Sequence, residues 1–101
     1  MKKNDFLKKI FSEIKKDNLE NFKQLLENSK AVYFKNKQKE NLLFYSLQSG
    51  SLKISQFLLE NYPEFLLERN SYLLTPFSDL IYRNNNKGFK AFLSLAKSNK
   101  L

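Results

Sequence analysis

Two stretches of the chain repeat each other at a distance of 34 residues. Residues 41–59 read NLLFYSLQSGSLKISQFLL and align without a gap with residues 75–93, which read TPFSDLIYRNNNKGFKAFL. The matched apolar pairs are Leu43 with Phe77, Leu47 with Ile81, Leu58 with Phe92 and Leu59 with Leu93, and Gly50 matches Asn84. A period in the thirties is typical of stacked repeat proteins, because one unit cannot bury its apolar face without neighbours.

A fainter third copy lies 33 residues before the first of these stretches. Its matches are Ile10 with Leu43, Phe11 with Phe44, Ile14 with Leu47, Asp17 with Gly50, Leu19 with Leu52, and Leu25-Leu26 with Leu58-Leu59. The chain of 101 residues therefore predicts one domain of three units, at about residues 4–35, 36–69 and 70–101. Three units are expected to make up the whole stack, with any function on its surface and not in a pocket.

Apolar residues inside each unit follow helical spacing, so each unit is predicted to contain two helices. The first three expected helices cover residues 5–16, 19–28 and 42–47. The fourth runs from Leu52 and stops at Tyr62-Pro63, the fifth begins at Thr75-Pro76, and the sixth follows the turn at 84–86. Asp17 or Asn18 is a candidate cap for the second helix and Ser51 for the fourth. Residues 29–40 are expected to form an exposed loop and residues 64–74 the next connection. The predicted class is all-α, with a short helix, a tight turn, a longer helix and a loop in each unit.

Large apolar residues at helical spacing are assigned to packing between helices. This set is Phe22, Leu25, Leu26, Phe57, Leu58, Leu59, Phe92 and Leu93, with Phe77, Leu80 and Ile81 as the buried side of the third unit's first helix. Phe34 and Phe65 are expected to seal the junctions between units. The end units of a stack need polar outer faces. The candidates are Lys8, Lys9, Glu13, Lys23 and Glu27 at one end, and Lys90, Lys97 and Lys100 at the other.

The composition argues against an enzyme and against a bound cofactor or metal. There is no Cys and no His, so the usual nucleophile–base pairs and most zinc sites cannot be built. The carboxylates are scattered along the chain, and two Gly are too few for a phosphate-binding glycine loop. No segment has the roughly 20 apolar residues that cross a bilayer. A soluble, cytoplasmic, monomeric protein is expected.

The net charge of +8 is distributed unevenly along the chain. Residues 1–40 carry +5, residues 41–70 carry −1 and residues 71–101 carry +4. Such a balance fits an acidic protein surface, nucleic acid or an anionic membrane. Codon composition is a competing explanation of the positive charge. Sixteen Lys against two Arg, together with many Asn and Phe, is the usage that AT-rich codons produce.

The repeats resemble the ankyrin family over nearly the whole chain. The family unit opens its first helix with Thr-Pro-Leu-His, has a Gly in the turn and closes its second helix with Leu-Leu. Thr75-Pro76-Phe77-Ser78 matches the opening, Gly50-Ser51-Leu52 with Leu58-Leu59 matches the middle, and Asp17-Asn18-Leu19 with Leu25-Leu26 matches it more weakly. The sequence departs from the family at Lys39 and Leu73, where the family has a turn Gly, and at Ser46-Leu47 and Leu80-Ile81, where it has paired Ala.

The resemblance implies a protein-binding module that uses the concave face of the stack. That face consists of the loop tips and the exposed side of each first helix. The tips are Lys37, Gln38 and Glu40, then Ser71, Tyr72 and Leu74; the helix positions are Lys15, Lys16, Gln48, Ser49, Tyr82 and Arg83. Tyr82 and Arg83 are the leading pair, since Tyr and Arg are frequent interface hot spots. The alternative for Tyr82 is burial under the last helix, and for the others a solvated side chain without a role.

The function expected from this resemblance is non-catalytic binding of a partner protein with an acidic surface. A bacterial inhibitor or immunity protein, or a regulator, fits this description, and a host-directed effector is an alternative. The other alternative is a small basic nucleic-acid-binding protein. The aromatic and Gly signatures of common RNA-binding modules are absent, so only weak, salt-sensitive nucleic-acid binding is expected.

Overall fold

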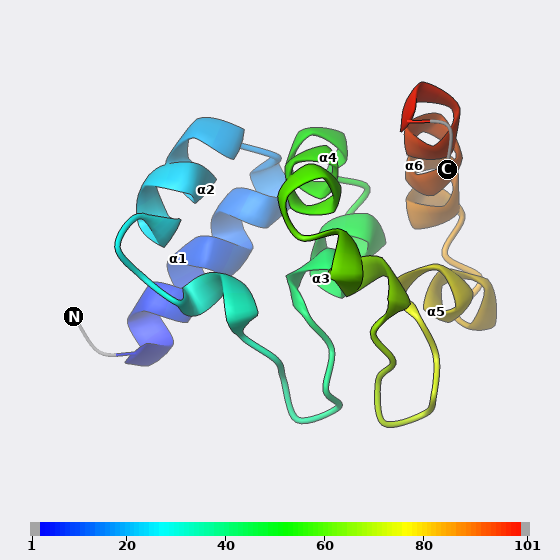
Figure 1. Cartoon of the computed structure of the whole chain (residues 1–101), viewed down its shortest axis with the longest axis horizontal. Helices are drawn as coiled ribbons and strands as arrows, with labels where there is room; N and C mark the ends of the chain where they lie inside the picture. Colours follow the sequence, from blue (N-terminus) through cyan, green and yellow to red (C-terminus); the bar gives the residue numbers. More distant parts are fainter. Residues whose placement is uncertain (1–2, 100–101) are drawn as a thin grey trace.

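The computed structural model describes residues 3–99 and contains α-helices, short 3-10 helices and loops over that range, without a strand. The α-helices are α1 Lys3–Lys16, α2 Leu19–Leu26, α3 Leu42–Gln48, α4 Leu52–Asn61, α5 Pro76–Tyr82 and α6 Asn86–Asn99. Two 3-10 helices, η1 Ala31–Tyr33 and η2 Pro63–Leu67, follow α2 and α4. The all-α class is therefore confirmed (Figure 1).

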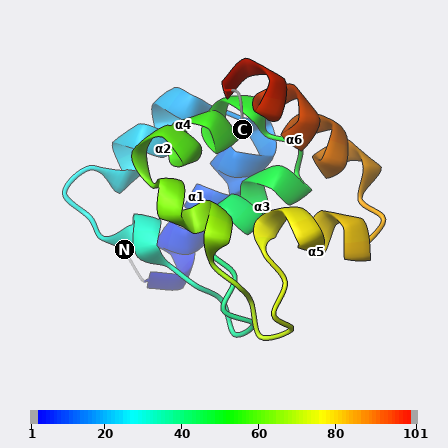
Figure 2. The same cartoon turned by 45° about the vertical axis from the view of Figure 1, so that its right-hand side comes forward.

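The α-helices form three successive pairs arranged in a row and in two layers (Figures 1 and 2). Within each pair the two helices are in contact, α1 with α2, α3 with α4 and α5 with α6. In one layer α3 contacts both α1 and α5, and in the other layer α4 contacts both α2 and α6. The middle pair is therefore packed on both sides, and the α5–α6 pair stands at one end of the row.

The core lies between the layers and is made of aliphatic side chains with Phe22 and Phe65. Its members include Ile10, Ile14, Phe22, Leu42, Leu43, Leu47, Ile54, Leu58, Phe65, Leu80 and Leu95. Phe22, Leu58 and Leu59 are buried as predicted, while Leu25, Leu26, Phe57 and Phe92 are partly buried against the core. The Phe34 ring lies 5.5 Å from Phe11 of α1 and 6.4 Å from Tyr45 of α3, so it contacts both sides of the first junction as predicted.

Two core predictions are wrong, and both concern the last helix pair. Ile81 is 54% exposed although its repeat partner Leu47 is fully buried. Leu93 is 42% exposed although its repeat partner Leu59 is buried. The cause is position in the row, because the middle pair has neighbours on both sides and the last pair has a neighbour on one side. Lys90 and Lys97 are exposed there as expected of an end unit, but the end is not wholly polar; Lys100 lies outside the described residues.

The first helix pair departs from the predicted order of lengths. The second and third pairs have the shorter helix first, whereas α1 has 14 residues and α2 has 8. The N-terminal apolar stripe continues without a break to Ile14, so nothing stops α1 early. The loop over residues 29–40 is also less exposed than predicted, since Val32 in η1 and Glu40 are buried.

The turn inside each helix pair has the same backbone conformation. Asp17, Gly50 and Asn84, which match in the repeat, have φ values of 53°, 71° and 55°. Gly adopts this left-handed region freely, and Asp and Asn tolerate it better than most residues do. Three different side chains therefore support one turn geometry.

Side chains from one pair hold the start of a helix in the next. Asp17 accepts hydrogen bonds from the backbone N–H groups of Lys53 and Ile54, both at 3.0 Å, while the Ser51 hydroxyl donates to the Ile14 carbonyl. Ser51 makes no side-chain capping bond of its own, so Asp17 supplies the cap that was expected from Ser51. Asn18, the other candidate, caps α2 by accepting from the Asn21 N–H.

The junction between the second and third pairs is tighter still. Asn85 Nδ2 donates to the Gln48 carbonyl oxygen at 3.0 Å. A Cβ atom placed on Gly88 would lie 2.5 Å from the Leu47 carbonyl oxygen and 2.5 Å from Leu80 Cδ2. The backbone at the start of α6 therefore rests directly on the end of α3, which only a residue without a side chain permits.

Candidate protein-binding surface

The two connecting loops contain the same tight turn, built around an Asn. Asn36 Oδ1 accepts from the N–H groups of Gln38 and Glu40, both at 2.9 Å. Asn70 Oδ1 accepts from Tyr72 and Leu74, at 2.9 and 3.0 Å. These side-chain bonds hold the backbone where the ankyrin pattern would have a turn Gly.

Lys39 and Leu73, which stand where the ankyrin pattern has a turn Gly, adopt the left-handed backbone conformation themselves. Lys39 has φ 63° and Leu73 has φ 64°, a region that such side chains adopt rarely. The two loops lie side by side, since the Ser71 N–H donates to the Gln38 carbonyl oxygen at 2.8 Å. Figure 1 shows them as the adjacent tips at the lower edge of the molecule.

Glu40 is buried at the base of these loops. The prediction that it lies at an exposed loop tip is therefore wrong. Its carboxylate accepts from Asn36 Nδ2 at 3.0 Å, from Asn70 Nδ2 at 3.2 Å and from Arg83 Nη2 at 3.3 Å. One side chain thus connects both loops to the end of α5. In the chain as described, no buried side-chain nitrogen or oxygen lacks a hydrogen-bond partner.

Arg83 and Asp79 extend this polar network to α3. Arg83 Nε donates to both carboxylate oxygens of Asp79, at 2.9 and 3.0 Å, and Gln48 Nε2 donates to Asp79 Oδ2 at 2.9 Å. The hydrogen bond to Asp79 raises the pKa of the Arg83 guanidinium; burial opposes the shift, and the negative charges of Asp79 and Glu40 add to it. Gln48 and Arg83, both predicted contact residues, are therefore brought together as parts of the framework.

Arg83→Ala is expected to destabilise the fold by about 1–3 kcal/mol, because Asp79 and Glu40 would remain buried without their counter-charge. The half-exposed guanidinium keeps the expected loss below that of a fully buried pair. The measurement is urea unfolding followed by circular dichroism. Arg69→Ala is the matched control, since the exposed Arg69 side chain donates only to the Leu73 carbonyl. Equal losses for the two variants would show that the network contributes nothing.

Two tyrosines project from this framework into solvent. Tyr82 is 76% exposed and Tyr72 is 67% exposed. Tyr82 is therefore not covered by the last helix, which was the alternative for it. Lys15, Lys37 and Gln38 are exposed as well, and Leu74 is half-buried with its N–H held by Asn70.

The two lysines at the end of α1 line different hollows. Lys15 lines a cavity of about 170 Å³ together with Phe11, Ile14, Tyr45 and Ser49. The Phe11 and Tyr45 rings are stacked there with centroids 4.6 Å apart. The structure thus brings Lys15 and Ser49 to one hollow between α1 and α3.

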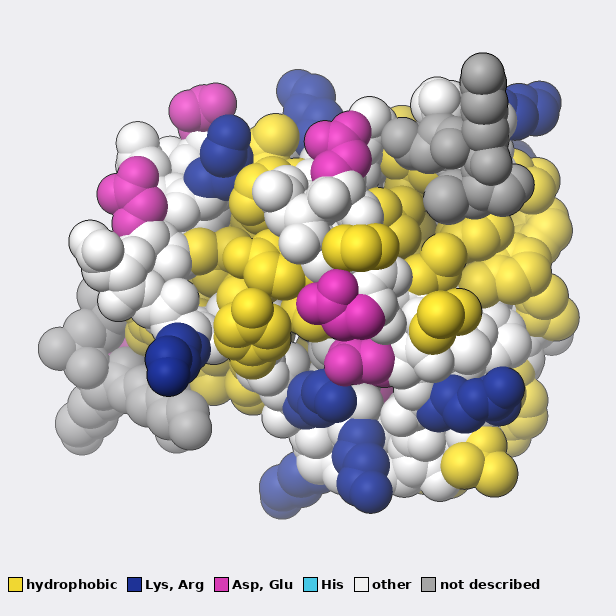
Figure 3. All heavy atoms as spheres, in the orientation of Figure 1, with side chains coloured by type: hydrophobic (Ala, Val, Ile, Leu, Met, Phe, Trp, Pro, Cys, Tyr) yellow, Lys and Arg dark blue, Asp and Glu magenta, His cyan; other side chains and the backbone are white. Residues whose placement is uncertain are grey.

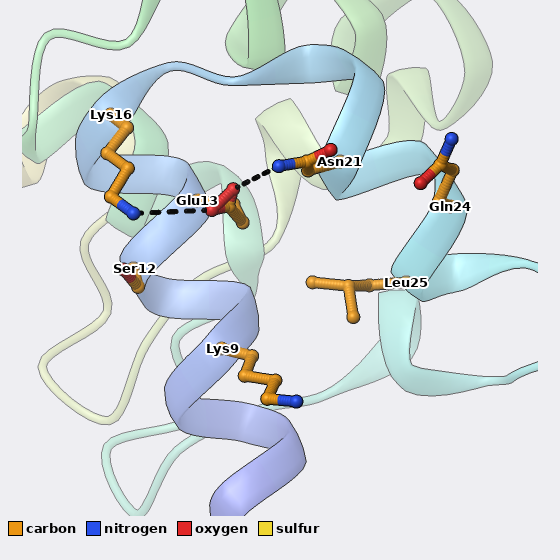
Figure 4. A pocket seen from close by; sticks show the side chains of 7 residues that line it. All are labelled: Lys9, Ser12, Glu13, Lys16, Asn21, Gln24 and Leu25. Carbon is orange, nitrogen blue, oxygen red and sulfur yellow. Dashed lines mark hydrogen bonds and ion pairs between the residues drawn. The ribbon is translucent and has the colours of Figure 1, made fainter.

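Lys16 faces a second, larger hollow between α1 and α2. This hollow of about 420 Å³ is lined by Lys9, Ser12, Glu13, Lys16, Asn21, Gln24 and Leu25 (Figure 4). Glu13 lies at its centre, accepting from Asn21 Nδ2 at 3.2 Å and paired with Lys16 Nζ at 3.6 Å. Lys16 is therefore separated from the Lys15 and Ser49 hollow.

Reading the sequence for exposed contacts identified Gln48 and Arg83 but missed Asn36, Asn70 and Asp79. Asn36 and Asn70 stand 34 residues apart, which is the repeat distance, and this signal could have identified the Asn-held loops. The i, i+4 spacing of Asp79 and Arg83 was a second signal in the sequence, whereas the hydrogen bonds that join Glu40 to Asn70 and Arg83 span 30 and 43 residues.

The comparisons with known proteins yield no family: no protein-family model matches the chain, and neither does any curated protein. Within residues 3–99, no helix is long and apolar enough to cross a membrane. The same residues contain no cluster of His, Cys, Asp or Glu that could hold a metal ion.

Proposed function

We propose that the three helix pairs form an ankyrin-like stack that binds a partner protein without catalysis. The binding surface consists of the inner helices α1, α3 and α5 and the tips of the two Asn-held loops. The matching left-handed turns at Asp17, Gly50 and Asn84, and the matching loops at Asn36 and Asn70, support a repeated unit.

The observation that carries the proposal is the exposure of Tyr72 and Tyr82 on a framework fixed by hydrogen bonds. Tyr offers a large contact area with little loss of side-chain entropy, and it is enriched among interface hot spots. A framework that is already ordered avoids part of the entropy cost of association. Tyr72 lies within the Asn70 turn and Tyr82 precedes the anchored Arg83, so both are presented by ordered backbone.

The charge supports an acidic partner surface. Lys15 stands at the repeat position that matches Tyr82, and Lys37 lies in the loop beside the one that carries Tyr72. Both lysines are exposed, and the chain carries +8. Complementary charge of this kind raises the association rate more than the final affinity. An inhibitor or immunity protein, a regulator of an enzyme, and a host-directed effector all fit this chemistry.

Tyr82→Ala is expected to weaken partner binding by at least about 2 kcal/mol, roughly thirtyfold in Kd, with little change in folding stability. The chain is first used to isolate partners from cells of its source, and the Kd is then measured by calorimetry for the isolated partner. Tyr72→Ala is expected to act in the same direction.

Tyr33→Ala is the control, because Tyr33 is a third exposed tyrosine, at 59%, which lies outside the proposed surface and packs on Tyr62 and Phe65. Unchanged affinity in Tyr82→Ala and Tyr72→Ala, with loss in Tyr33→Ala, would contradict the proposed surface. Sequence-selective retention of DNA or RNA at physiological salt would favour the nucleic-acid alternative instead.

A further inference from the structure

The outward side of the α5–α6 pair presents a group of apolar side chains, here called the C-terminal end face: Phe77, Ile81, Phe89 and Leu93. Phe77 and Ile81 are one turn apart on α5, and Phe89 and Leu93 are one turn apart on α6. The Phe77 and Phe89 rings are stacked with centroids 5.8 Å apart. Figure 3 shows hydrophobic side chains gathered along the right-hand edge of the molecule, over α5 and α6.

The repeat alignment matches the C-terminal end face to a surface that is buried in the middle pair. The four positions of the C-terminal end face match Leu43, Leu47, Ser55 and Leu59 in the middle pair. All four of those residues are buried in the middle pair, which has α5 and α6 packed beside it. The C-terminal end face therefore continues an interface that the molecule already uses internally, and a helix pair has the shape that fits it.

A hollow in the C-terminal end face lies at the repeat position on which, in the first two pairs, the start of a helix from the next pair packs. It has a volume of about 200 Å³, and Leu80, Ile81, Asn84, Asn85, Asn86 and Phe89 line it. At the matching place near Ile14 and Asp17, the start of α4 is held by Asp17. At the matching place near Leu47 and Gly50, the start of α6 lies against the Leu47 carbonyl. The equivalent position in the third pair, at Ile81 and Asn84, has no helix of this chain packed on it within the described residues.

The charge around the end face selects the partner. Lys90, Leu93 and Lys97 follow one another at spacings of three and four along α6, and all three are exposed. No Asp or Glu occurs between residues 80 and 101. An apolar helix pair flanked by carboxylates would match both features, while one flanked by lysines would be repelled.

A second copy of this chain fits the end face poorly. Pairing two end faces about a twofold axis would bring Lys90 and Lys97 of both copies to one interface. Stacking head to tail would place the end face on the α1–α2 end, where Lys9 and Lys16 flank the polar hollow of Figure 4. The twofold arrangement brings positive charges together, and the head-to-tail arrangement covers polar side chains, Glu13 among them, with apolar ones.

We propose that the C-terminal end face binds a helical hairpin of an acidic partner protein, which packs on Ile81 and Leu93 and places carboxylates near Lys90 and Lys97. This surface does not include Tyr72, and it adjoins Tyr82, which follows Ile81 in α5. The probe is a synthetic helical hairpin of roughly 30 residues, the size of one repeat unit, with an apolar stripe flanked by Glu. A second probe has Lys in place of every flanking Glu.

Binding of each probe to the full chain is measured by fluorescence anisotropy. The Glu probe is expected to bind at least about tenfold more tightly than the Lys probe, and Ile81→Asp or Leu93→Asp to weaken it at least about tenfold. Lys90→Glu combined with Lys97→Glu should reverse the preference between the probes. This charge swap keeps the apolar residues, so it tests the proposal even where an Asp variant lowers the melting temperature. Tyr72→Ala, in the loop after η2, should leave probe binding unchanged, which separates this proposal from the proposed function.

Three outcomes would overturn the proposal. The first is equal binding of the two probes, or binding that Ile81→Asp and Leu93→Asp leave intact. The second is a concentration-dependent dimer in analytical ultracentrifugation that Leu93→Asp dissociates, which would assign the end face to a second copy. The third is retention on vesicles containing phosphatidylserine that Leu93→Asp abolishes, which would assign it to a membrane surface. The expected results are a monomer and no retention on vesicles.

Discussion

Gly88→Ala is expected to destabilise the protein by on the order of 3 kcal/mol, because the added methyl group has no room. It would lie 2.5 Å from the Leu47 carbonyl oxygen, which is backbone and cannot turn aside, and 2.5 Å from Leu80 Cδ2. Relief requires α6 to move away from α3 and α5, which opens the junction between the second and third pairs. The free energy of unfolding is measured by urea denaturation of both proteins.

Whether Gly88→Ala lowers or raises the stability distinguishes a Gly88 packed against backbone from an exposed one. In an exposed helix, Gly→Ala is favourable by up to about 1 kcal/mol, because Ala has the higher helix propensity. Ser94→Ala on the solvent side of α6 is the control, and its stability is expected to stay within about 0.5 kcal/mol of the parent. A Gly88→Ala protein as stable as the parent would show that α6 does not rest on the end of α3.

Leu58→Ala is expected to cost about 2–5 kcal/mol, as is usual when a fully buried leucine is truncated. Leu58 has no exposed surface and belongs to the core between the two layers. The lost stability combines the transfer of the missing methyl groups with the cavity that remains. Thermal and urea unfolding monitored at a helical wavelength provide the measurement.

Leu59 and Leu93 provide a matched test of the row of helix pairs. They occupy the same repeat position, yet Leu59 is buried in the middle pair and Leu93 is 42% exposed in the last. Leu59→Ala is therefore expected to cost clearly more than Leu93→Ala, which should stay below about 1 kcal/mol. Similar losses at both positions would mean that the last pair is covered as fully as the middle one.

Much of the architecture was predictable because helical spacing and repeat spacing are local properties of the chain. The start of α5 at Pro76 follows from Thr75, which caps the helix together with Ser78, and the end of α4 follows from Tyr62-Pro63. The lengths of α1 and α2 were predicted in the wrong order, since the pattern of the later pairs was carried back to the first pair.

The candidate surface was only partly predictable, for a reason visible in Arg83 and Glu40. Sequence position placed both on an exposed face, and Arg83 is half exposed there. The pair of Asp79 and Arg83 has the i, i+4 spacing of one helix face, which is a local pattern. The hydrogen bonds that join Glu40 to Asn70 and to Arg83 instead span 30 and 43 residues of the chain, and no local pattern indicates them. Tyr72 and Tyr82 remain exposed because no neighbouring element offers them a partner or a cover in the described range.

The sequence by itself determined the helical class, the 34-residue period, most of the core and the absence of His and Cys chemistry. These depend on residue type and spacing along the chain, which are local. Tertiary structure alone decided that Glu40 is buried, that Asp17 caps a helix of the next pair, and that Ile81 and Leu93 are exposed while Leu47 and Leu59 are not. Identical repeat positions have different surroundings according to their place in the row, and burial depends on those surroundings and not on the residue.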